Sequence, residues 1–182
     1  MANHFAWVAI YRNRDAVTHT QHYFPEDVDP VIFIEALVDC MCAENNVVFN
    51  VAKGILHDLI KAVFVLCGNK DVASPLKVFE TLAIMFVHAC YQREWSRKRA
   101  GVDGILIITR QLSLRWVRKY EILFIRALIF VLKDLPPEVD VTVREVAADA
   151  LASLIRYCHS PPGTVPEQWP EWPGRFKDAK GM

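Results

Sequence analysis

Hydrophobic side chains recur at helical spacing through the body of the chain, and caps and breakers divide this pattern into segments. The capping positions are Asp29-Pro30, Asn45-Asn46, Ser74-Pro75 and Ser113, and the breakers are Gly68-Asn69 and Pro136-Pro137. The pattern predicts six helices, over about residues 30–43, 47–66, 75–91, 95–111, 114–133 and 141–158.

Short links between successive helices make neighbours antiparallel, so the six helices form three hairpins. The hairpins begin near residues 30, 75 and 114, which are 45 and 39 residues apart. HEAT and armadillo units repeat at about 40–47 residues. We therefore expect an all-α, HEAT/armadillo-like helical-repeat solenoid of about three antiparallel helix pairs, with a compact irregular helical domain as the alternative. The expected units are an irregular segment over 1–24, the repeat domain over 25–159, and a Pro/Gly-rich, disordered tail over 160–182.

The fifth predicted helix indicates how deeply the stack is packed. At about 100° per residue, its basic side chains fall in one narrow strip and most of the remaining circumference is apolar. The strip consists of Arg115, Lys119, Arg126 and Lys133. An unpaired buried arginine is costly, so this strip should face water or a partner. The first helix is more apolar than one-sided packing needs, and neither end of the stack carries an obvious polar cap. We expect a segment of something longer, or a chain that docks end-on to a partner.

Composition agrees with a packed domain. Hydrophobic residues make up 53% of the 182 residues, and 21 Lys and Arg balance 21 Asp and Glu, which is unlike a disordered chain. The longest apolar run, Phe5–Tyr11, is far shorter than the roughly 20 residues of a spanning helix, so no membrane contact is expected. The five cysteines are odd in number and lie mostly in helical pattern, which favours reduced, buried thiols over a disulfide framework.

No enzyme signature is found in the sequence: phosphate-binding loop, kinase, serine hydrolase and zinc protease motifs are all missing. We predict no catalytic residue, no cofactor and no small-molecule substrate. Two candidate sets of zinc ligands are Cys40-x-Cys42 with His57, and His88-x-Cys90. Residues two apart on a helix point in nearly opposite directions, so they cannot easily bind one ion and no metal is expected. Gly101-Val102-Asp103-Gly104 is similar to a G-x-x-G nucleic-acid clamp, but its strand–helix setting is absent and the start of a helix explains it better.

Charge is concentrated in the middle of the chain. Residues 93–126 hold 9 basic and 3 acidic side chains. The candidate partner-binding basic face consists of Arg97, Lys98, Arg115, Lys119 and Arg126. Such a face can be solvated and paired with acidic neighbours in the next repeat, or it can bind an acidic peptide or nucleic acid.

This same region resembles the TRRAP family, the transformation/transcription domain-associated proteins of the PI3-kinase-related group. The residues that carry the resemblance are Ala89-Cys90-Tyr91, Trp95, Lys98, Gly101-Val102, Ile105, Leu112, Leu114, Trp116-Val117, Phe124, Ala127-Leu128, Phe130-Val131, Asp134-Leu135, Glu138-Val139, Ala147, Leu151, Leu154 and Cys158. A weaker likeness extends back through Ile34 and Ala36–Asp39, so the resemblance covers about residues 25–162 and leaves out the tail at Trp169–Pro173.

The resemblance implies HEAT-type repeats within a very large, nuclear, non-catalytic scaffold of histone acetyltransferase coactivator complexes. It implies protein partners, namely acetyltransferase-complex subunits and transcription activators, and no family catalytic residue can be transferred. We expect the chain to be a fragment of a longer protein. Two alternatives stay open: a HEAT segment of an active PI3-kinase-related kinase, and a basic-faced helical repeat that binds nucleic acid.

Overall fold

The computed structural model describes residues 30–134 and 141–160, and all the regular structure in these ranges is helical. The elements are α2 (Pro30–Met41), α3 (Asn46–Cys67), α4 (Lys70–Ala73), α5 (Lys77–Cys90), α6 (Trp95–Gln111), α7 (Leu114–Asp134) and α8 (Val141–His159). The six predicted helices are confirmed, and the short α4 is an addition. The predicted N-terminal segment at 1–24 and the tail beyond Ser160 lie outside the described residues.

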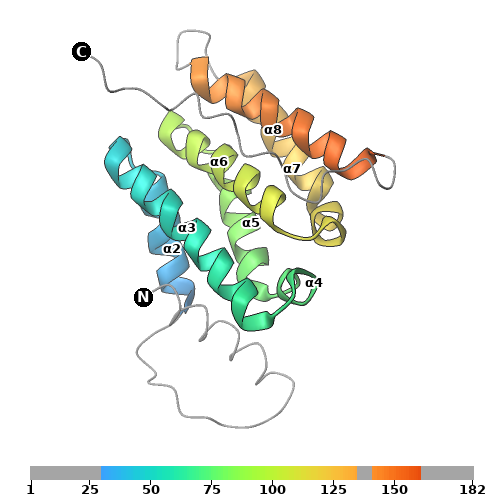
Figure 1. The fold of residues 1–182 in the computed structure, drawn as a ribbon. Coiled ribbons are helices and arrows are strands. Elements are labelled where there is room, and N and C mark those ends of the chain that lie inside the picture. The colour runs from blue at the N-terminus through green and yellow to red at the C-terminus, as the bar shows by residue number, and fades with distance from the viewer. Residues whose placement is uncertain (1–29, 135–140, 161–182) are drawn as a thin grey trace, which may run out of the picture.

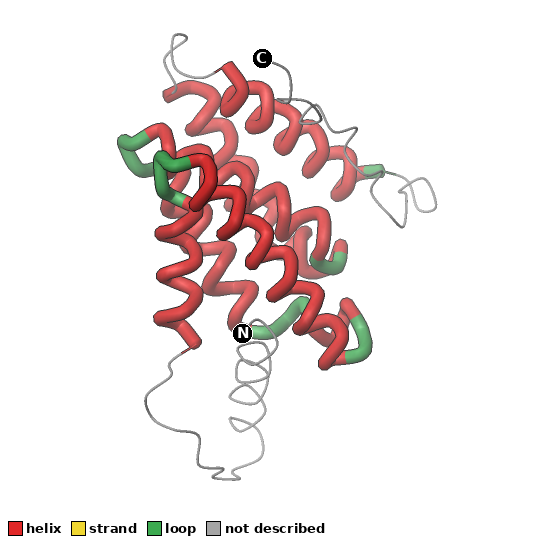
Figure 2. Tube along the Cα trace, turned by 60° about the vertical axis from the view of Figure 1, so that its left-hand side comes forward, coloured by secondary structure: helices red, strands yellow, loops and turns green. Residues whose placement is uncertain are grey.

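The helices form three antiparallel pairs, α2 with α3, α5 with α6 and α7 with α8. Figure 1 looks onto one layer made of α3, α6 and α8, with α2, α5 and α7 forming the layer behind. Each layer is continuous, because α5 contacts both α2 and α7, and α6 contacts both α3 and α8. Short connections join successive helices at the edges of the stack (Figure 2). This two-layer stack is the predicted HEAT-like solenoid.

Local capping chemistry sets the ends of α3. The Asn45 side chain accepts hydrogen bonds from the backbone N–H groups of Val47 and Val48 at 2.8 and 3.4 Å. At the other end, Gly68 adopts φ 69°, and its N–H donates to the Phe64 carbonyl at 2.9 Å. Both ends are therefore where the sequence places them.

Ser74 has a different role from the predicted one. The residue before α5 is Leu76, which makes no side-chain capping bond, so Ser74 does not cap that helix. Its hydroxyl instead donates to the Lys70 carbonyl at 2.7 Å and accepts from the Ser113 N–H at 2.9 Å. Ser74 thus closes α4 and joins it to the start of α7. A single-residue cap rule cannot predict a bond between residues 39 apart in sequence.

A continuous apolar core fills the space between the two layers. Its largest fully buried side chains are Phe79, Phe86, Phe124, Met41, Leu56, Leu59, Ile60, Leu82, Ile105, Ile108, Leu112 and Leu128. The predicted faces of α7 are confirmed, with Trp116 and Phe124 buried and Arg115, Arg126 and Lys133 exposed. Of the helices that the structure describes, none is long and apolar enough to cross a membrane.

Two glycines bring α5 and α6 into direct contact. Gly101 and Gly104 are buried in the middle of α6, not at a helix start as the sequence suggested. A Cβ on Gly101 would lie 2.6 Å from the Phe86 carbonyl oxygen and 2.8 Å from the Cys90 backbone nitrogen. A Cβ on Gly104 would overlap the Phe86 ring. The G-x-x-G spacing therefore serves close helix packing, because residues three apart share a helix face.

We expect Gly101→Ala and Gly104→Ala each to lower the free energy of unfolding by about 2–3 kcal/mol, because overpacking a close contact forces the helices apart. Gly54→Ala is the matched control: nothing lies within 4 Å of its Cβ position. It should stabilise α3 by about 0.5–1 kcal/mol through the loss of backbone entropy in the unfolded chain. Urea unfolding followed by circular dichroism gives all three values. Equal effects at the three glycines would contradict the close-contact interpretation.

Candidate functional site

Lys98 belongs to the interior and not to the predicted basic face. It is only 2% exposed, and its Nζ lies 2.7 Å from the Asp134 carboxylate and donates to the Gln92 carbonyl. The Phe130 ring centroid is 5.1 Å from the same nitrogen. Lys98 therefore connects the start of α6 to the end of α7 and is not available to a partner. The sequence pattern could not show this, because the covering groups come from a distant helix.

Two arginines of the basic region 93–126 also form contacts inside the fold: each donates a hydrogen bond to a backbone carbonyl near a helix end. Arg99 donates to the Ala43 carbonyl at 3.0 Å and to Asn46 Oδ1 at 2.7 Å, and its guanidinium lies 4.1 Å from the Phe49 ring centroid. Arg118 donates from Nη2 to the Cys158 carbonyl in the last turn of α8 at 2.8 Å. A cation there complements the helix dipole. Both residues thus stabilise contacts between helices.

The exposed members of the predicted face lie in separate places. Arg97 is exposed near the start of α6, 3.9 Å from both Asp39 and Glu94 carboxylates. Lys98, three residues into α6, touches Asp134, so this end of α6 lies beside the last turn of α7. Arg115 lies in the first turn of α7. At 1.5 Å per residue, the first turn is roughly 27 Å from the last turn along the helix. The five residues therefore do not form one surface.

What remains is a mixed basic and apolar surface on α7. Ile122 is 61% exposed, and Ile129 is 38% exposed. These isoleucines lie within about 20–80° of the exposed basic residues on the helical wheel. We call this surface the α7 outer face; it consists of Arg115, Lys119, Ile122, Arg126, Ile129 and Lys133. Exposed aliphatic side chains between cations favour a protein partner over a phosphate backbone.

A pocket of about 880 Å³ adjoins the first two turns of α7. It is lined by Asp71, Pro75, Glu80, Ser113, Arg115, Trp116, Lys119 and Tyr120. Helix α7 supplies two cations of the α7 outer face to this lining, and α4 and α5 supply two carboxylates. The Trp116 and Tyr120 rings also line the pocket, and their centroids are 4.4 Å apart. The pocket extends the α7 outer face into a recess of balanced charge.

Hydrogen bonds and burial perturb two titrating groups in this recess. A hydrogen bond with the Tyr120 hydroxyl is the main cause that raises the pKa of Lys119. The Lys119 Nζ also lies 5.1 Å from the Tyr120 ring centroid. Burial is the main cause that raises the pKa of Tyr120, and the Glu80 carboxylate adds to it. Lys119 therefore stays charged and Tyr120 neutral at physiological pH, which suits binding rather than proton transfer.

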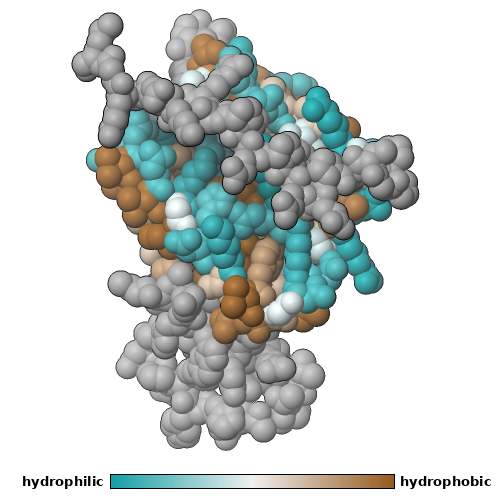
Figure 3. Space-filling view, viewed as in Figure 1, coloured by the Kyte–Doolittle hydropathy of each residue, from teal (hydrophilic) through white to brown (hydrophobic). Residues whose placement is uncertain are grey.

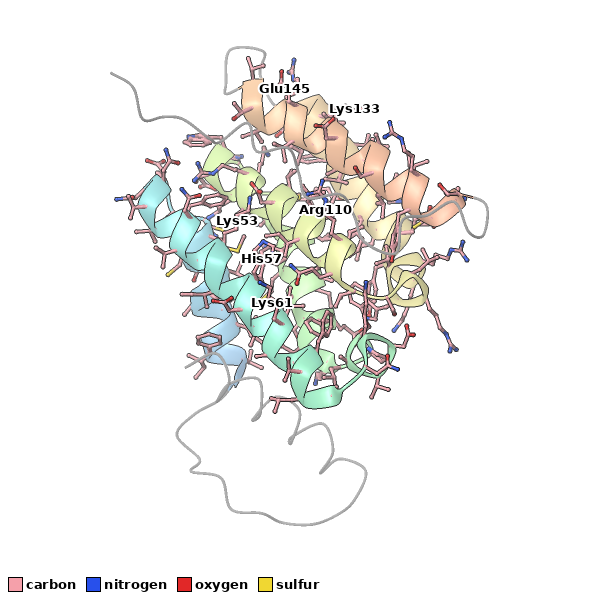
Figure 4. All side chains as sticks on the ribbon, in the orientation of Figure 1. Lys53, His57, Lys61, Arg110, Lys133 and Glu145 are labelled. Carbon is pink, nitrogen blue, oxygen red and sulfur yellow. The ribbon has the colours of Figure 1, made fainter. Side chains whose placement is uncertain are left out.

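A second polar contact, missed by the sequence analysis, joins α3 to α6. Lys53 pairs with the Asp103 carboxylate, and the Gln111 side chain bonds to His57 Nδ1. Figure 4 shows Lys53, His57 and Lys61 in succession along α3, with Arg110 on α6. Burial and then the neighbouring Lys53 and Lys61 lower the pKa of His57, so this histidine is neutral at pH 7. The spacing of Lys53, His57 and Lys61, four residues apart, is the sequence signal for a shared face.

Three of the five cysteines are buried, which makes their thiols poor nucleophiles. Cys42, Cys90 and Cys158 are buried, as expected, whereas Cys40 is exposed. Burial raises the pKa of Cys90 to about 12 and that of Cys158 to about 11, so both thiols are protonated at neutral pH. Within residues 30–134 and 141–160, no group of three or more His, Cys, Asp or Glu side chains could hold a metal ion.

Comparison with known proteins decides the family. The model of the Tra1 HEAT repeat ring region matches residues 1–174. This chain belongs to that family. The match is longer than the resemblance seen in the sequence, and it includes the N-terminal segment and Trp169–Pro173, which the sequence analysis had left out. The helical stack is thus part of a HEAT ring family, as the TRRAP resemblance implied.

Named relatives agree with this assignment. The chain is 27% identical over 146 residues, 80% of its length, to the human Transformation/transcription domain-associated protein. It is 27% identical over 161 residues, 88% of its length, to Transcription-associated protein 1 of Drosophila melanogaster. It is 29% identical over 137 residues, 72% of its length, to the SAGA complex/NuA4 acetyltransferase complex subunit Tra1 of Schizosaccharomyces pombe. The chain spans about 4% of the length of each relative. No solved structure matches.

Some arginines of residues 93–126 stabilise the fold, and others are exposed. Two arginine-to-methionine substitutions distinguish these roles by their effect on the free energy of unfolding. Arg99→Met removes charged hydrogen bonds to the α2–α3 connection and should lower the free energy of unfolding by about 1.5–3 kcal/mol. Arg126→Met removes an exposed charge from the α7 outer face and should change it by less than about 0.5 kcal/mol. Chemical denaturation of the purified variants tests both. A large loss at Arg126 would mean that α7 is covered there.

Proposed function

We propose that this chain is a non-catalytic helical-repeat scaffold segment that acts in transcription regulation in the nucleus through protein–protein contacts. The observation that carries this proposal is the α7 outer face of a chain in the Tra1 HEAT ring family. It is a solvent-facing surface on a rigid helix, with cations around exposed isoleucines. Such a surface matches the anatomy of protein interfaces, which combine an apolar centre with a polar rim.

The packing of α7 supports its role as a platform. Its inner side chains Val117, Phe124 and Val131 are fully buried, so the helix cannot shift without loss of core contacts. Lys98 and Arg118 hold α7 to α6 and α8 through Asp134 and the Cys158 carbonyl. A partner that binds the α7 outer face therefore meets a preorganised surface and loses little conformational entropy on the scaffold side.

The proposed partners follow from the names of the relatives. The Schizosaccharomyces pombe and Saccharomyces cerevisiae relatives are named as subunits of the SAGA complex and the NuA4 acetyltransferase complex. We propose that this chain contacts other subunits of an acetyltransferase complex of that kind, and transcription activators. A complementary partner carries an acidic rim around an apolar centre, because opposite charges guide association and fix orientation.

Two alternatives predict different behaviour. A HEAT segment of an active PI3-kinase-related kinase would match kinase relatives, whereas the relatives matched here are transcription-associated proteins. A nucleic-acid-binding repeat needs clustered cations, and the buried Lys98 and the separation of Arg97 from Arg115 speak against it. Duplex DNA binding at physiological salt that falls by about 0.9 log units per phosphate contact for each log unit of salt would favour this alternative.

The proposal predicts that Arg115→Glu with Arg126→Glu weakens capture of acetyltransferase-complex subunits. The tagged full chain is purified from nuclei of cells that make it, and subunits are quantified by mass spectrometry. Two charge reversals at a complementary interface should reduce recovery by about tenfold or more, because like charges facing each other cost several kcal/mol.

Lys61→Glu is the control, because Lys61 is exposed on α3, in the other layer. It should leave recovery unchanged. Equal losses for the control and the double variant, with equal unfolding midpoints, would remove the α7 outer face from the proposal. Recovery of the chain without acetyltransferase subunits would contradict the proposed function as a whole.

A further inference from the structure

The recess at the start of α7 is lined by two cations and two carboxylates, and only one of each is engaged inside the fold. Lys119 and Glu80 both hydrogen-bond to the Tyr120 hydroxyl, so these three side chains form a connected group between α5 and α7. Arg115 and Asp71 also line the recess and are exposed. Among the described residues, neither the Arg115 guanidinium nor the Asp71 carboxylate makes a hydrogen bond or an ion pair.

The recess keeps these two unpaired charges apart. Arg115 comes from α7 and Asp71 from α4, and both line the same space of about 880 Å³. Pockets that bind ligands typically measure about 300–1,000 Å³. On the face shown in Figure 3, hydrophilic residues predominate where α4 and the start of α7 lie, at the lower right of the view in Figure 1. A cation and an anion that share one recess without pairing can each bind the opposite charge of a ligand.

The aromatic part of the lining is preformed. Trp116 is 6% exposed and Tyr120 is 8% exposed, so both rings are held mostly in the core. The Phe124 ring centroid lies 6.3 Å from that of Trp116 and 6.1 Å from that of Tyr120. The Ser113 N–H, which donates to the Ser74 hydroxyl at 2.9 Å, joins the end of α4 to the start of α7. Because these groups are already fixed, the protein loses little conformational entropy when a ligand binds here.

We propose that this recess is an anchor pocket for a peptide segment of a partner protein in which an acidic and a basic side chain flank an aromatic one. The acidic side chain pairs with Arg115 and the basic one with Asp71. The aromatic ring packs against the exposed parts of Trp116 and Tyr120. This inference rests on the proposed function, because Arg115 and Lys119 belong both to the recess and to the α7 outer face. A partner docked on that face therefore lies beside the recess.

Charge selects this occupant over others. A purely acidic segment would bring its carboxylates against Asp71 and Glu80, and the phosphates of nucleic acid would meet the same two groups. A purely basic segment would meet Arg115 and Lys119. Only a segment that carries both signs complements the whole lining. Arginine, tryptophan and tyrosine are the residue types that most often dominate the binding energy of an interface, and the recess offers all three.

The test is a titration of the purified 182-residue chain with short synthetic peptides, followed by NMR through the indole N–H of Trp116. The Trp116→Phe variant identifies this resonance by its loss. The peptides have blocked termini and differ only in a central triplet, which is glutamate–phenylalanine–lysine, its reverse, glutamate–phenylalanine–glutamate, or lysine–phenylalanine–lysine.

At least one of the two mixed peptides should bind saturably, with a Kd of about 1 mM or tighter. The doubly acidic and doubly basic peptides should each bind about tenfold more weakly, because a like-charge contact at one end opposes the attraction at the other. Glycine in place of the phenylalanine should remove the binding, because the ring supplies the apolar contact.

Two charge reversals should change the preference of the recess in opposite directions. Asp71→Lys should favour the doubly acidic peptide and Arg115→Glu the doubly basic one, each by about tenfold. Both residues are exposed, so the variants keep the fold, and their unfolding midpoints verify this. Asp58→Lys and Lys61→Glu are the matched controls: they make the same charge changes at exposed positions of α3, outside the recess, and should leave the preference unchanged.

Three results would overturn the proposal. The first is a Trp116 resonance that neither mixed peptide shifts. The second is a wild-type chain that binds the doubly acidic peptide at least as tightly as the mixed ones, which would assign the recess to a purely acidic partner. The third is a preference that Asp71→Lys and Arg115→Glu leave unchanged.

Failure of the anchor pocket can be separated from failure of the proposed function. Asp71 lies outside the α7 outer face, and Asp71→Lys should lower the recovery of acetyltransferase subunits about tenfold if the partner enters the recess. Unchanged recovery with Asp71→Lys, together with a loss for Arg115→Glu with Arg126→Glu, would overturn the anchor pocket and keep the α7 outer face. Selective binding of a mixed peptide without any recovery of subunits would support the pocket and contradict the proposed function.

Discussion

The contact of α5 with α6 through two glycines is the constraint on which the stack depends. Gly101 and Gly104 allow the Phe86 ring and the Cys90 backbone to lie directly against α6. That contact sets the distance between the two layers in the central pair. Helices α2 and α7 then pack against α5, and α3 and α8 against α6, so the helices of the other two pairs are positioned by this pair. A methyl group at Gly101 would require the backbone of α5 to move, and one at Gly104 would require the Phe86 ring to move.

Charged residues add further contacts between helices to those made by the apolar core. Lys98, Arg99 and Arg118 reach across helix boundaries to a carboxylate or to backbone carbonyls near helix ends. Bonds of this kind satisfy groups that a helix cannot satisfy internally, and they fix the relative rotation of neighbouring helices. These cations form contacts inside the fold. The number of basic residues in the middle of the chain is therefore larger than the number that is exposed and accessible to a partner.

The exposed surfaces of α7 and α3 are chemically distinct and lie in different layers. The α7 outer face combines cations with isoleucines, whereas α3 exposes the valines Val47, Val51 and Val65. A mixed surface suits a partner that binds and is selected by charge, and an apolar surface suits a permanent neighbour.

The sequence by itself determined the six helices, their pairing and the family, because helix periodicity, caps at Asn45 and Gly68, and repeat spacing are local properties of the chain. It also placed Arg115, Arg126 and Lys133 on the exposed side of α7. Only the tertiary structure decided that Lys98 is buried, that Ser74 bonds to Ser113, and that the Gly101–Gly104 pair serves helix packing. The physical reason is the same in each case: a residue's periodicity is set by its own helix, but its burial and its partners are set by a helix distant in sequence.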